Sequence, residues 1–514
     1  MLSSCFLIIS SPQIGSRWLL LWPLLFGLSR PALAQTTGLP ARRPVFEAAP
    51  LQTPRLNTTR PGDTMAVFSL QNLADLVFAN HPIVKQAALL SDEARSQVLQ
   101  ARGGFDPKLS ADFNRKQFGG TNYYNNWGNE LKIPLWPGGI DLKASYDRNV
   151  GTYVNPEGRT PLNGLAGVGL SVPIGQGLLI DARRSTLRQA RVLQAAAEAD
   201  RVKQINEVWL QAAKDYWTWY YTFRQAGLVQ EGVALADQRF RGIARRAQLG
   251  DQAPIDSVEA QITLQDRQVQ AEQLRVDLQN ARLVLSNHLW TPAGQPAELP
   301  AYAVPQAPVL DSVGRAELVR LTDFAAAQHP TLRKLAAKIS QLSIEERYRR
   351  ELLKPKLNVS GVLISQGNFY QSEVPAYSFG RDNYKVGVDF AFPLFLRQER
   401  GKLQYTRIQV QETTLERQQS QRTILTQVNT VYNTLRACAR QLALQAQTIA
   451  NQRALLQAEL QKFELGESTI FLVNTRESKL IELLIKQESL RASYEKARAE
   501  LYYYAGTRSV EAGQ

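Results

Sequence analysis

The sequence has few of the residues from which enzymes and metal sites are built. Its 514 residues include two cysteines, Cys5 and Cys438, and three histidines, His81, His288 and His329, which stand far apart. Cys5 falls within a predicted leader, so Cys438 is left without an intrachain disulfide partner. No phosphate loop, GxSxG, HExxH or CxxC motif is present. We therefore expect no enzyme, no metal site and no cofactor.

Long apolar runs are also missing. No segment after residue 34 offers about 18 consecutive apolar residues, so we expect no transmembrane helix. Residues 1–34 are predicted to be a secretory signal peptide, because Arg17 precedes an apolar core from Trp18 to Leu28 and Ala32-Leu33-Ala34 offers a cleavage site. The alternative, an N-terminal membrane anchor, is disfavoured because this core is too short to span a bilayer. An exported chain of this kind is either soluble or held in an outer membrane by strands.

Charge of one sign is not gathered in any one part of the chain. The formal net charge is +14, and such an excess can indicate a nucleic acid or an anionic surface as partner. Here Lys and Arg are interleaved with Glu, Asp and Gln along predicted helices, which is typical of solvated helix faces. Together with the signal peptide, this pattern argues against nucleic acid as a partner.

The sequence repeats itself over long distances. His81-Pro82 is answered by His329-Pro330, 248 residues later, and Gly250 by Gly466, 216 residues later. Long internal periods reveal architecture, and the order helix, strands, long helix, glycine turn, helix occurs twice. A histidine before a proline is expected to have a structural role in each repeat.

The repeats predict the following boundaries. Before them lie a signal peptide, 1–34, and a flexible Pro-rich lead-in, 35–66. Repeat 1, 67–290, has helix 70–104, strands 107–174, long helix 178–249 and helix 255–290. After a linker, 291–312, repeat 2, 313–506, has helix 318–353, strands 355–394, long helix 396–465 and helix 469–505, and a tail, 507–514, follows it.

Two of the predicted helices are too long for a globular protein. From Gly401 to Gly466, apolar residues recur every three, four or seven positions and form a stripe on one helix face. A helix of about 65 residues would be roughly 100 Å long, a length found in coiled coils, tubes and solenoids. Each long helix ends at a glycine and turns into another helix, which predicts two hairpins with tips at Gly250 and Gly466. The aromatic run from Tyr216 to Phe223 is expected to pack helices together at the waist of this tube.

Between the leading helix and the long helix, each repeat changes to period two. In repeat 2, Val386, Val388 and Phe390 alternate with Lys385 and Asp389. This alternation is typical of transmembrane β-strands. A soluble sandwich would show it too, but the signal peptide and the aromatic residues near the strand ends favour a membrane barrel. Four such strands cannot close a barrel, and lipid requires closure, so several chains must share one barrel.

Repeat 1 contains an additional alternating pair of segments within 126–149, separated by Pro137-Gly138-Gly139. These segments either add two strands per chain to the barrel or form an extended surface hairpin. We favour the extended hairpin, since it preserves the symmetry of the two repeats.

The hairpin tips and the paired helix–strand junctions resemble a known family. Arg239-Phe240 followed by Gln248-Leu249-Gly250 forms the first tip, and Lys462-Phe463-Glu464-Leu465-Gly466 forms the second. Over about residues 68–507 this duplicated order resembles the TolC-like outer-membrane efflux protein family. The resemblance implies a mainly α-helical fold with membrane β-structure. In that family, long helical hairpins form a twelve-helix periplasmic α-barrel, which joins a twelve-stranded transmembrane β-barrel shared by three chains.

The same resemblance implies partners and a function. It implies a homotrimer in outer-membrane lipid, with a periplasmic adaptor (membrane fusion) protein and an inner-membrane pump completing the export path. The expected function is the outer-membrane channel of a tripartite efflux or type I secretion system, and the expected location is the outer membrane with a long periplasmic extension. Two other classes remain as alternatives. One is a secreted, soluble coiled-coil scaffold, and the other is a passive porin, which would not need the long helices.

The resemblance also implies where partners dock and where the channel closes. The hairpin tips are expected to dock the adaptor, and the helices after them to form the periplasmic aperture. The predicted tip residues are Gln248, Leu249, Gly250, Asp251, Glu464, Leu465, Gly466 and Glu467. The predicted aperture residues are Asp256, Leu472, Thr475 and Arg476.

The aperture departs from the family pattern. Leu472 and Thr475 occupy the positions of the family's paired gate aspartates, so that acidic ring is absent. Asp256 matches a family aspartate of the closed-state polar links, but Ser468 replaces its basic partner. Neighbouring residues that could substitute are Glu467, Arg476 and Glu477. The alternative for Asp256 is a simple role at the first turn of its helix.

Overall fold

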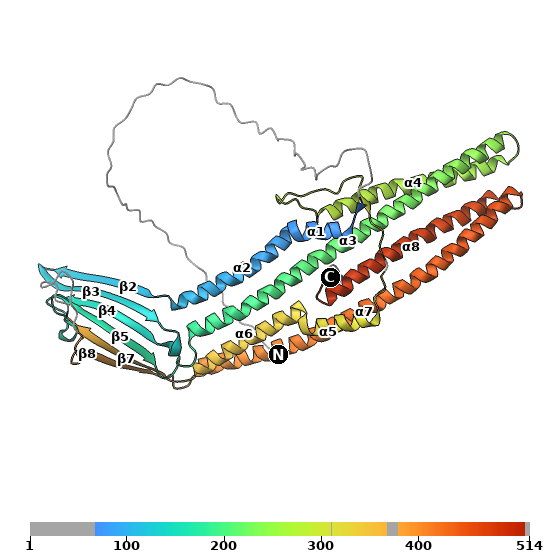
Figure 1. Ribbon diagram of the computed structural model, residues 1–514. Coiled ribbons are helices and arrows are strands. Elements are labelled where there is room, and N and C mark those ends of the chain that lie inside the picture. Colours follow the sequence, from blue (N-terminus) through green and yellow to red (C-terminus); the bar gives the residue numbers. More distant parts are fainter. Residues whose placement is uncertain (1–66, 310, 367–378, 509–514) are drawn as a thin grey trace, which may run out of the picture. The chain divides into compact units, whose positions relative to one another are not determined.

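The computed structural model describes residues 67–309, 311–366 and 379–508, all of them within one compact unit, Arg55–Gln514 (Figure 1). The predicted signal peptide and lead-in, residues 1–66, lie outside the described residues. The helices are α1 (Leu70–Asn80), α2 (Pro82–Arg102), α3 (Ala182–Gln248), α4 (Pro254–Ser286), α5 (Arg315–Gln328), α6 (Pro330–Glu351), α7 (Arg397–Glu464) and α8 (Ile470–Tyr504). The strands are β1 (Val67–Phe68), β2 (Lys108–Phe118), β3 (Thr121–Pro134), β4 (Asp141–Val150), β5 (Leu165–Pro173), β6 (Val304–Pro305), β7 (Lys356–Ser365) and β8 (Tyr384–Ala391).

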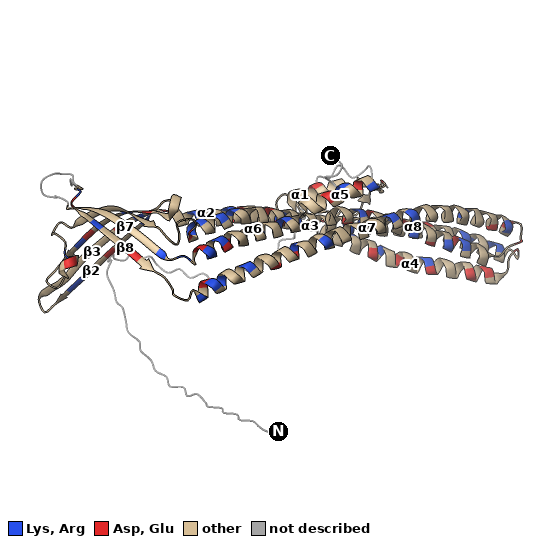
Figure 2. Ribbon diagram, turned by 90° about the horizontal axis from the view of Figure 1, so that it is seen from below, with Lys and Arg blue, Asp and Glu red and all other residues tan. Residues whose placement is uncertain are grey.

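Two very long helices run from the strands to the hairpin tips. α3 has 67 residues and α7 has 68, so each is about 100 Å long at 1.5 Å per residue. In the half next to the sheet the helices pack in the order α2, α3, α6, α7, and in the half next to the tips in the order α4, α3, α8, α7 (Figure 1). Basic and acidic residues are interleaved along these helices (Figure 2), as expected for solvated faces. Among the described residues, none of the helices combines the length and the hydropathy needed to cross a bilayer.

Each leading helix, predicted as one rod over 70–104 and over 318–353, is in fact two helices. A residue that precedes proline is driven out of the helical region, and His81 and His329 have extended backbones with ψ of 130° and 129°. The Nδ1 atom of each ring accepts a hydrogen bond at 3.2 Å from the backbone N–H two residues further on and so caps the next helix. The prediction of single helices was wrong, whereas the structural role expected for these two histidines is confirmed.

The aromatic run of α3 packs the waist of the wall, as predicted. Tyr216, Trp219 and Tyr220 are almost fully buried in a cluster that also includes residues of α1, α4, α8 and the linker. The Tyr216 hydroxyl donates to the Phe68 carbonyl at 2.9 Å and accepts from the Gln306 N–H at 3.1 Å. It thereby holds the short parallel pair β1 and β6. A second cluster, largely aliphatic, joins α5, α6, α7 and α8 in repeat 2.

The remaining six strands form one antiparallel sheet in the order β2, β3, β4, β5, β7, β8. β3 and β4 are the additional segments of repeat 1, and they lie in the body of the sheet. The expectation of an extended surface hairpin was therefore wrong. Both strands have ladder partners along both edges, and pairing satisfies their backbone groups regardless of the symmetry between the repeats.

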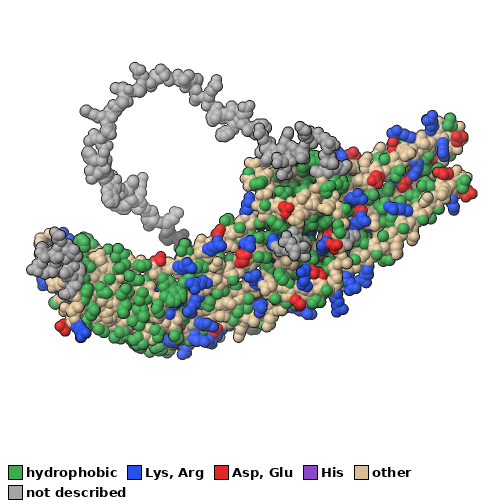
Figure 3. Space-filling view, in the orientation of Figure 1, with side chains coloured by type: hydrophobic (Ala, Val, Ile, Leu, Met, Phe, Trp, Pro, Cys, Tyr) green, Lys and Arg blue, Asp and Glu red, His purple; other side chains and the backbone are tan. Residues whose placement is uncertain are grey.

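The two faces of this sheet differ in polarity. Directly opposed residues lie on the same face. Although Val362 and Ile364 of β7 lie on the polar face, opposite Gly169 and Gly167, most apolar residues of the six strands fall on the other face. Its members include Leu109 and Phe113 (β2), Leu131 and Ile133 (β3), Leu142 and Ala144 (β4), Val168 and Leu170 (β5), Val359 and Leu363 (β7), and Val386, Val388 and Phe390 (β8). Many of these side chains are exposed in the single chain, and Figure 3 shows hydrophobic side chains gathered over the strands. Such a surface requires an apolar environment.

Candidate functional site: the hairpin tips and the ion network behind them

The two hairpin tips are built in the same way. α3 ends at Gln248 and α7 at Glu464, and the glycine two residues later has a positive φ, 82° at Gly250 and 78° at Gly466. The backbone N–H groups of the next residues, Asp251 and Glu467, reach back to helix carbonyls at 3.0 and 2.8 Å. Crossed bonds of this kind around a left-handed glycine close a helix. All eight predicted tip residues therefore lie at, or within one residue of, the two turns.

Each tip presents an apolar side chain to solvent. Leu249 is 71% exposed and Leu465 is 75% exposed. Behind them, Ile243, Ala260 and Ile470 are buried together, with aromatic residues of α3 and α7 packed around them. This small core contains residues of both hairpins, so the two tips of one chain are held against each other.

A network of buried ions lies further from the tips, between the two repeats. We call it the cross-repeat network, and its members are Arg239 (α3), Thr263 and Arg267 (α4), and Asn474 and Glu477 (α8). Arg267 Nη1 donates to Glu477 Oε1 at 2.7 Å and to the carbonyl of Gly232 at 2.8 Å. Arg239 Nη2 pairs with the other carboxylate oxygen of Glu477.

An asparagine extends this network. Arg239 Nη1 donates to Asn474 Oδ1 at 2.9 Å, and Asn474 Nδ2 contacts Thr263 Oγ1 at 3.3 Å. Glu477 is only 4% exposed and Arg267 only 7%. A buried carboxylate is tolerable only when it is paired and hydrogen-bonded, and here each of its oxygens has a guanidinium partner. The network therefore fixes α8 of repeat 2 to both helices of the repeat 1 hairpin, α3 and α4.

The predicted aperture residues have other partners. Thr475 Oγ1 bonds to the Phe471 carbonyl of its own helix at 2.8 Å. Arg476 approaches Glu459 of its own hairpin at 3.9 Å. Leu472 is partly exposed. Within the described part of the chain, no hydrogen bond or ion pair joins Asp256 to any of the other three.

Asp256 lies in the first turn of α4, where it is half-buried. Its charge adds to burial, the larger cause, in raising the pKa of Glu259 one turn later. From the sequence, Glu477 was expected as a possible substitute at the aperture and Arg239 as part of the first tip, whereas Arg267, Thr263 and Asn474 were not predicted. A signal for Arg267 was present, because it falls on the buried stripe that Ala260 and Leu264 begin.

Comparison with known proteins identifies the fold. A family model described as "Outer membrane efflux protein" matches residues 73–289 and 321–507, which cover most of the two repeats. The chain belongs to the outer membrane efflux protein family. Members of this family are outer-membrane channels, not enzymes, and they function as trimers in tripartite efflux pumps. The expected family, fold class and efflux-channel function are confirmed.

Solved structures show the same fold at low sequence identity. The CmeC outer membrane channel of Campylobacter jejuni is 13% identical with a TM-score of 0.60, covering 88% of this chain and 94% of that chain. The outer membrane protein VceC of Vibrio cholerae is 13% identical with a TM-score of 0.60, covering 85% and 96%. The open state of the MtrE outer membrane channel of Neisseria gonorrhoeae is 14% identical with a TM-score of 0.59, covering 85% and 89%. No curated protein matches.

Proposed function

We propose that three copies of this chain form one export duct, which receives cargo from a periplasmic adaptor and an inner-membrane pump and releases it through the outer membrane. The cargo would be the drugs or metal ions of an efflux system or the protein of a type I secretion system. One observation carries the proposal. Within the described residues β2 pairs only with β3 and β8 only with β7, so each chain supplies a curved wall segment with two open edges.

The open edges suit other copies of the same chain. β2 runs away from the helices and β8 returns to them, so β2 of one copy can pair antiparallel with β8 of the next. The helical layer ends on the same two sides, with α2 and α4 beyond α3 and with α7 at the opposite flank. Unpaired edge groups are costly in lipid, and closure by copies removes every edge.

The tips are the proposed docking surface for the adaptor. Leu249 and Leu465 are exposed apolar side chains on two rigid turns of like geometry, which suits contact with the hairpin tips of a helical partner. Replacing both with Glu should abolish co-purification with the adaptor and leave the trimer intact, because neither side chain belongs to the small core behind the tips. Leu235→Glu, at an exposed leucine on the shaft of α3, serves as the control. Adaptor binding that survives the tip change would reject this docking surface.

The aperture is proposed to be kept narrow by the cross-repeat network together with Asp256 and Leu472. The network holds the two hairpins of a chain together, and so restricts how far the tips can separate. Single-channel conductance of Glu477→Gln should rise, because the neutral amide weakens both guanidinium contacts. A combined Asp256→Ala and Leu472→Ala variant tests the other two residues. Unchanged conductance in that variant would mean that Asp256 acts only at the first turn of α4 and does not restrict the aperture.

Fractionation with crosslinking tests the duct itself. Outer-membrane vesicles should retain the protein until detergent is added, and crosslinking should give a trimer. A water-soluble protein after fractionation would support the scaffold alternative instead. A trimer that conducts ions but fails to restore export in a strain that contains the pump and adaptor and lacks their channel would support the porin alternative.

A further inference from the structure

Within the described residues the strand pair β3 and β4 has no counterpart in repeat 2, yet it matches its neighbours in register. Leu131 of β3 is opposite Leu109 of β2 and Ala144 of β4, and Leu142 is opposite Ile133 and Leu170. The apolar face of the sheet is therefore continuous from β2 through both additional strands to β5. The opposite face is continuous as well, since Glu130, Ser145 and Gly167 follow one another across the same strands.

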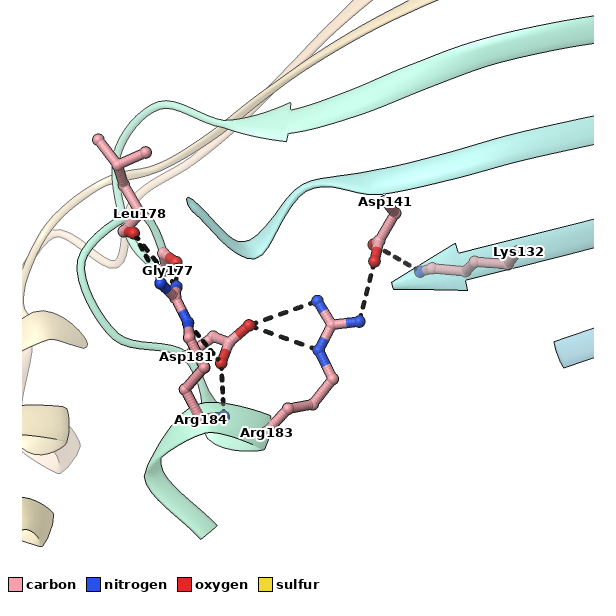
Figure 4. A network of polar contacts seen from close by, with 7 residues as sticks. All are labelled: Lys132, Asp141, Gly177, Leu178, Asp181, Arg183 and Arg184. Carbon is pink, nitrogen blue, oxygen red and sulfur yellow. Dashed lines mark hydrogen bonds and ion pairs between the residues drawn. The ribbon is translucent and has the colours of Figure 1, made fainter. Parts of the chain in front are cut away.

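The turn between these strands is anchored to the start of α3 (Figure 4). Asp141, the first residue of β4, accepts bonds from Arg183 Nη1 at 2.9 Å and from Lys132 Nζ at 3.0 Å. Arg183 also pairs with Asp181 at 3.3 Å, and Asp181 caps α3 by accepting from the backbone N–H of Arg184 at 2.8 Å. Arg184 in turn donates to the carbonyls of Gly177 and Leu178 between β5 and α3.

The turn itself fits this junction closely. Gly138 and Gly139 both have a φ of 67°, a conformation that favours glycine. A Cβ atom on Gly139 would lie 2.8 Å from the carbonyl oxygen of Gly177. A loosely attached surface hairpin would need neither this close approach nor the ion pairs. The additional strands are therefore part of the wall at its helical end.

We propose that the closed outer-membrane barrel of this protein has eighteen strands, since three copies of a six-stranded sheet contribute three times six. The partner at each edge is a second copy of this chain, with β2 of one copy paired to β8 of the next. The barrel is then about one and a half times as wide as the twelve-stranded barrel of the resemblance, because diameter grows with strand number. The inference rests on the proposed trimer.

Cysteine labelling in proteoliposomes tests whether β4 lies in the wall. Ser145→Cys is on the polar face and should react with a membrane-impermeant maleimide, whereas Ala144→Cys is on the apolar face and should react only with a lipid-soluble reagent. The matched control is the pair Ser171→Cys and Val168→Cys on β5. Cys438 is replaced by Ala in every variant, because it is the free thiol of the described chain. Equal reaction of both β4 cysteines with the impermeant reagent, beside a normal β5 control, would overturn the proposal.

Crosslinking tests the edges and separates the two possible failures. Ser110→Cys combined with Gly387→Cys or Asp389→Cys should give disulfide-linked trimers, because all three positions are on the polar face. Ala111→Cys combined with either partner should not, because Ala111 is on the other face. A protein that proves monomeric and soluble would reject the proposed duct. A membrane trimer whose projection images show a twelve-stranded cross-section would reject only the additional strands.

Deleting residues 121–160 offers a third measurement. The deletion joins β2 to β5 through six remaining residues and leaves four strands per chain. The largest polyethylene glycol that enters the pore from the outer side should then be smaller than for the full chain. An unchanged size limit in a correctly assembled deletion trimer would contradict the wider barrel. If the deletion variant fails to assemble, the cysteine labelling decides whether β4 lies in the wall.

Discussion

The two repeats are the same where the backbone sets the structure and different where side chains meet a neighbour. Their long helices end 216 residues apart at glycine turns of matching φ, and both leading helices break at a histidine–proline pair. At the waist, by contrast, the position of Trp219 in repeat 1 is that of Leu435 in repeat 2. The aromatic side chain packs against the linker and the short pair β1 and β6, which, in the part of the chain that the structure describes, repeat 1 alone carries on its surface.

The ion network shows the same contrast more strongly. At an offset of 216 residues, Leu455 and Leu483 stand in repeat 2 where repeat 1 has Arg239 and Arg267. Conversely, Gln261 stands in repeat 1 where repeat 2 has Glu477. The charged contact is therefore made once per chain, between its own repeats. A pseudo-equivalent contact with a neighbouring chain would lack all three ions. The chain thus distinguishes the interface within a copy from the interface between copies.

Removing the shared carboxylate should have the largest effect. Glu477→Ala leaves two guanidinium groups, one of them deeply buried, without their partner, and loss of one member of a buried pair costs about 3–5 kcal/mol. We expect a clear fall in the temperature at which trimers dissociate, and a higher conductance in the survivors.

Two controls separate this effect from a general weakening of α8. Glu482→Ala removes an acid from the same helix whose pair with Lys479 is exposed, and it should change little. A Glu477→Ala variant that also carries Arg239→Leu and Arg267→Leu copies repeat 2 at these positions, and it should regain most of the lost stability. No recovery in that variant would show that the ions do more than satisfy one another.

Glu495 of α8 should make stability depend on pH in repeat 2. Burial raises its pKa to about 7, with Arg498 opposing and Asp311 adding to this rise. Between about pH 4.5 and 7 the native state therefore binds more protons than the unfolded state, and stability falls as pH rises through this window. Above pH 7 the buried charge costs about 3 kcal/mol per chain, because the pKa rises from 4.5 to about 7 at about 1.36 kcal/mol per unit.

The matching residue in repeat 1 is Gln279, so Glu495→Gln makes the repeats alike. The variant should dissociate at a higher temperature than wild type at pH 8 and at nearly the same temperature at pH 5. His329 acts in the opposite direction, because burial lowers its pKa to about 4 and its contribution is lost as pH falls below about 6.5. Because His329 is present in both wild type and Glu495→Gln, its contribution cancels from the difference between their dissociation temperatures. Equal effects of Glu495→Gln at the two pH values would contradict this assignment.

The junctions between strands and long helices also differ between the repeats. The residue before α3 is Asp181, which caps the helix and pairs with Arg183. The residue before α7 is Leu396, which has a φ of 49° and makes no side-chain cap. Arg183→Ala should therefore cost about 1.5–3 kcal/mol, since hydrogen bonds to charged groups contribute on this scale. Arg95→Ala removes an exposed ion pair with Asp92 and should have little effect. Equal dissociation temperatures for the two variants would show that the anchor of β4 adds no stability.

The sequence predicted the features that depend on the spacing of apolar residues and on the positions of glycine. Alternation, the long apolar stripe and the glycine turns each follow from local geometry. The break at His81 and His329 was missed although the rule for residues before proline was available. The place of β3 and β4 was predicted wrongly because symmetry between repeats was preferred to their own alternation, which matches that of the other four strands.

The site was less accessible to prediction because its members come from three helices. Glu477 and Arg239 were seen only as residues near the tips, and nothing in the linear order joins either of them to Arg267. The packing of α8 against α3 and α4 brings them together. An arginine on a buried stripe was the available sign, since a buried guanidinium requires a partner. A comparison of the repeats would have indicated the same site, because Leu455 and Leu483 replace Arg239 and Arg267 in repeat 2.

The smallest predicted effect concerns the feature that the repeats share most closely. At Gly250 and Gly466 an added Cβ atom would meet no atom within 4 Å, so only the positive φ resists substitution. Gly250→Ala and Gly466→Ala should therefore each cost about 1 kcal/mol, equally in the two repeats, as measured by trimer dissociation. Gly227 of α3 serves as the control, because its helical backbone accepts alanine and nothing lies within 4 Å of its Cβ position. A larger cost at one tip than at the other would mean that a neighbouring copy contacts that tip in the assembled duct.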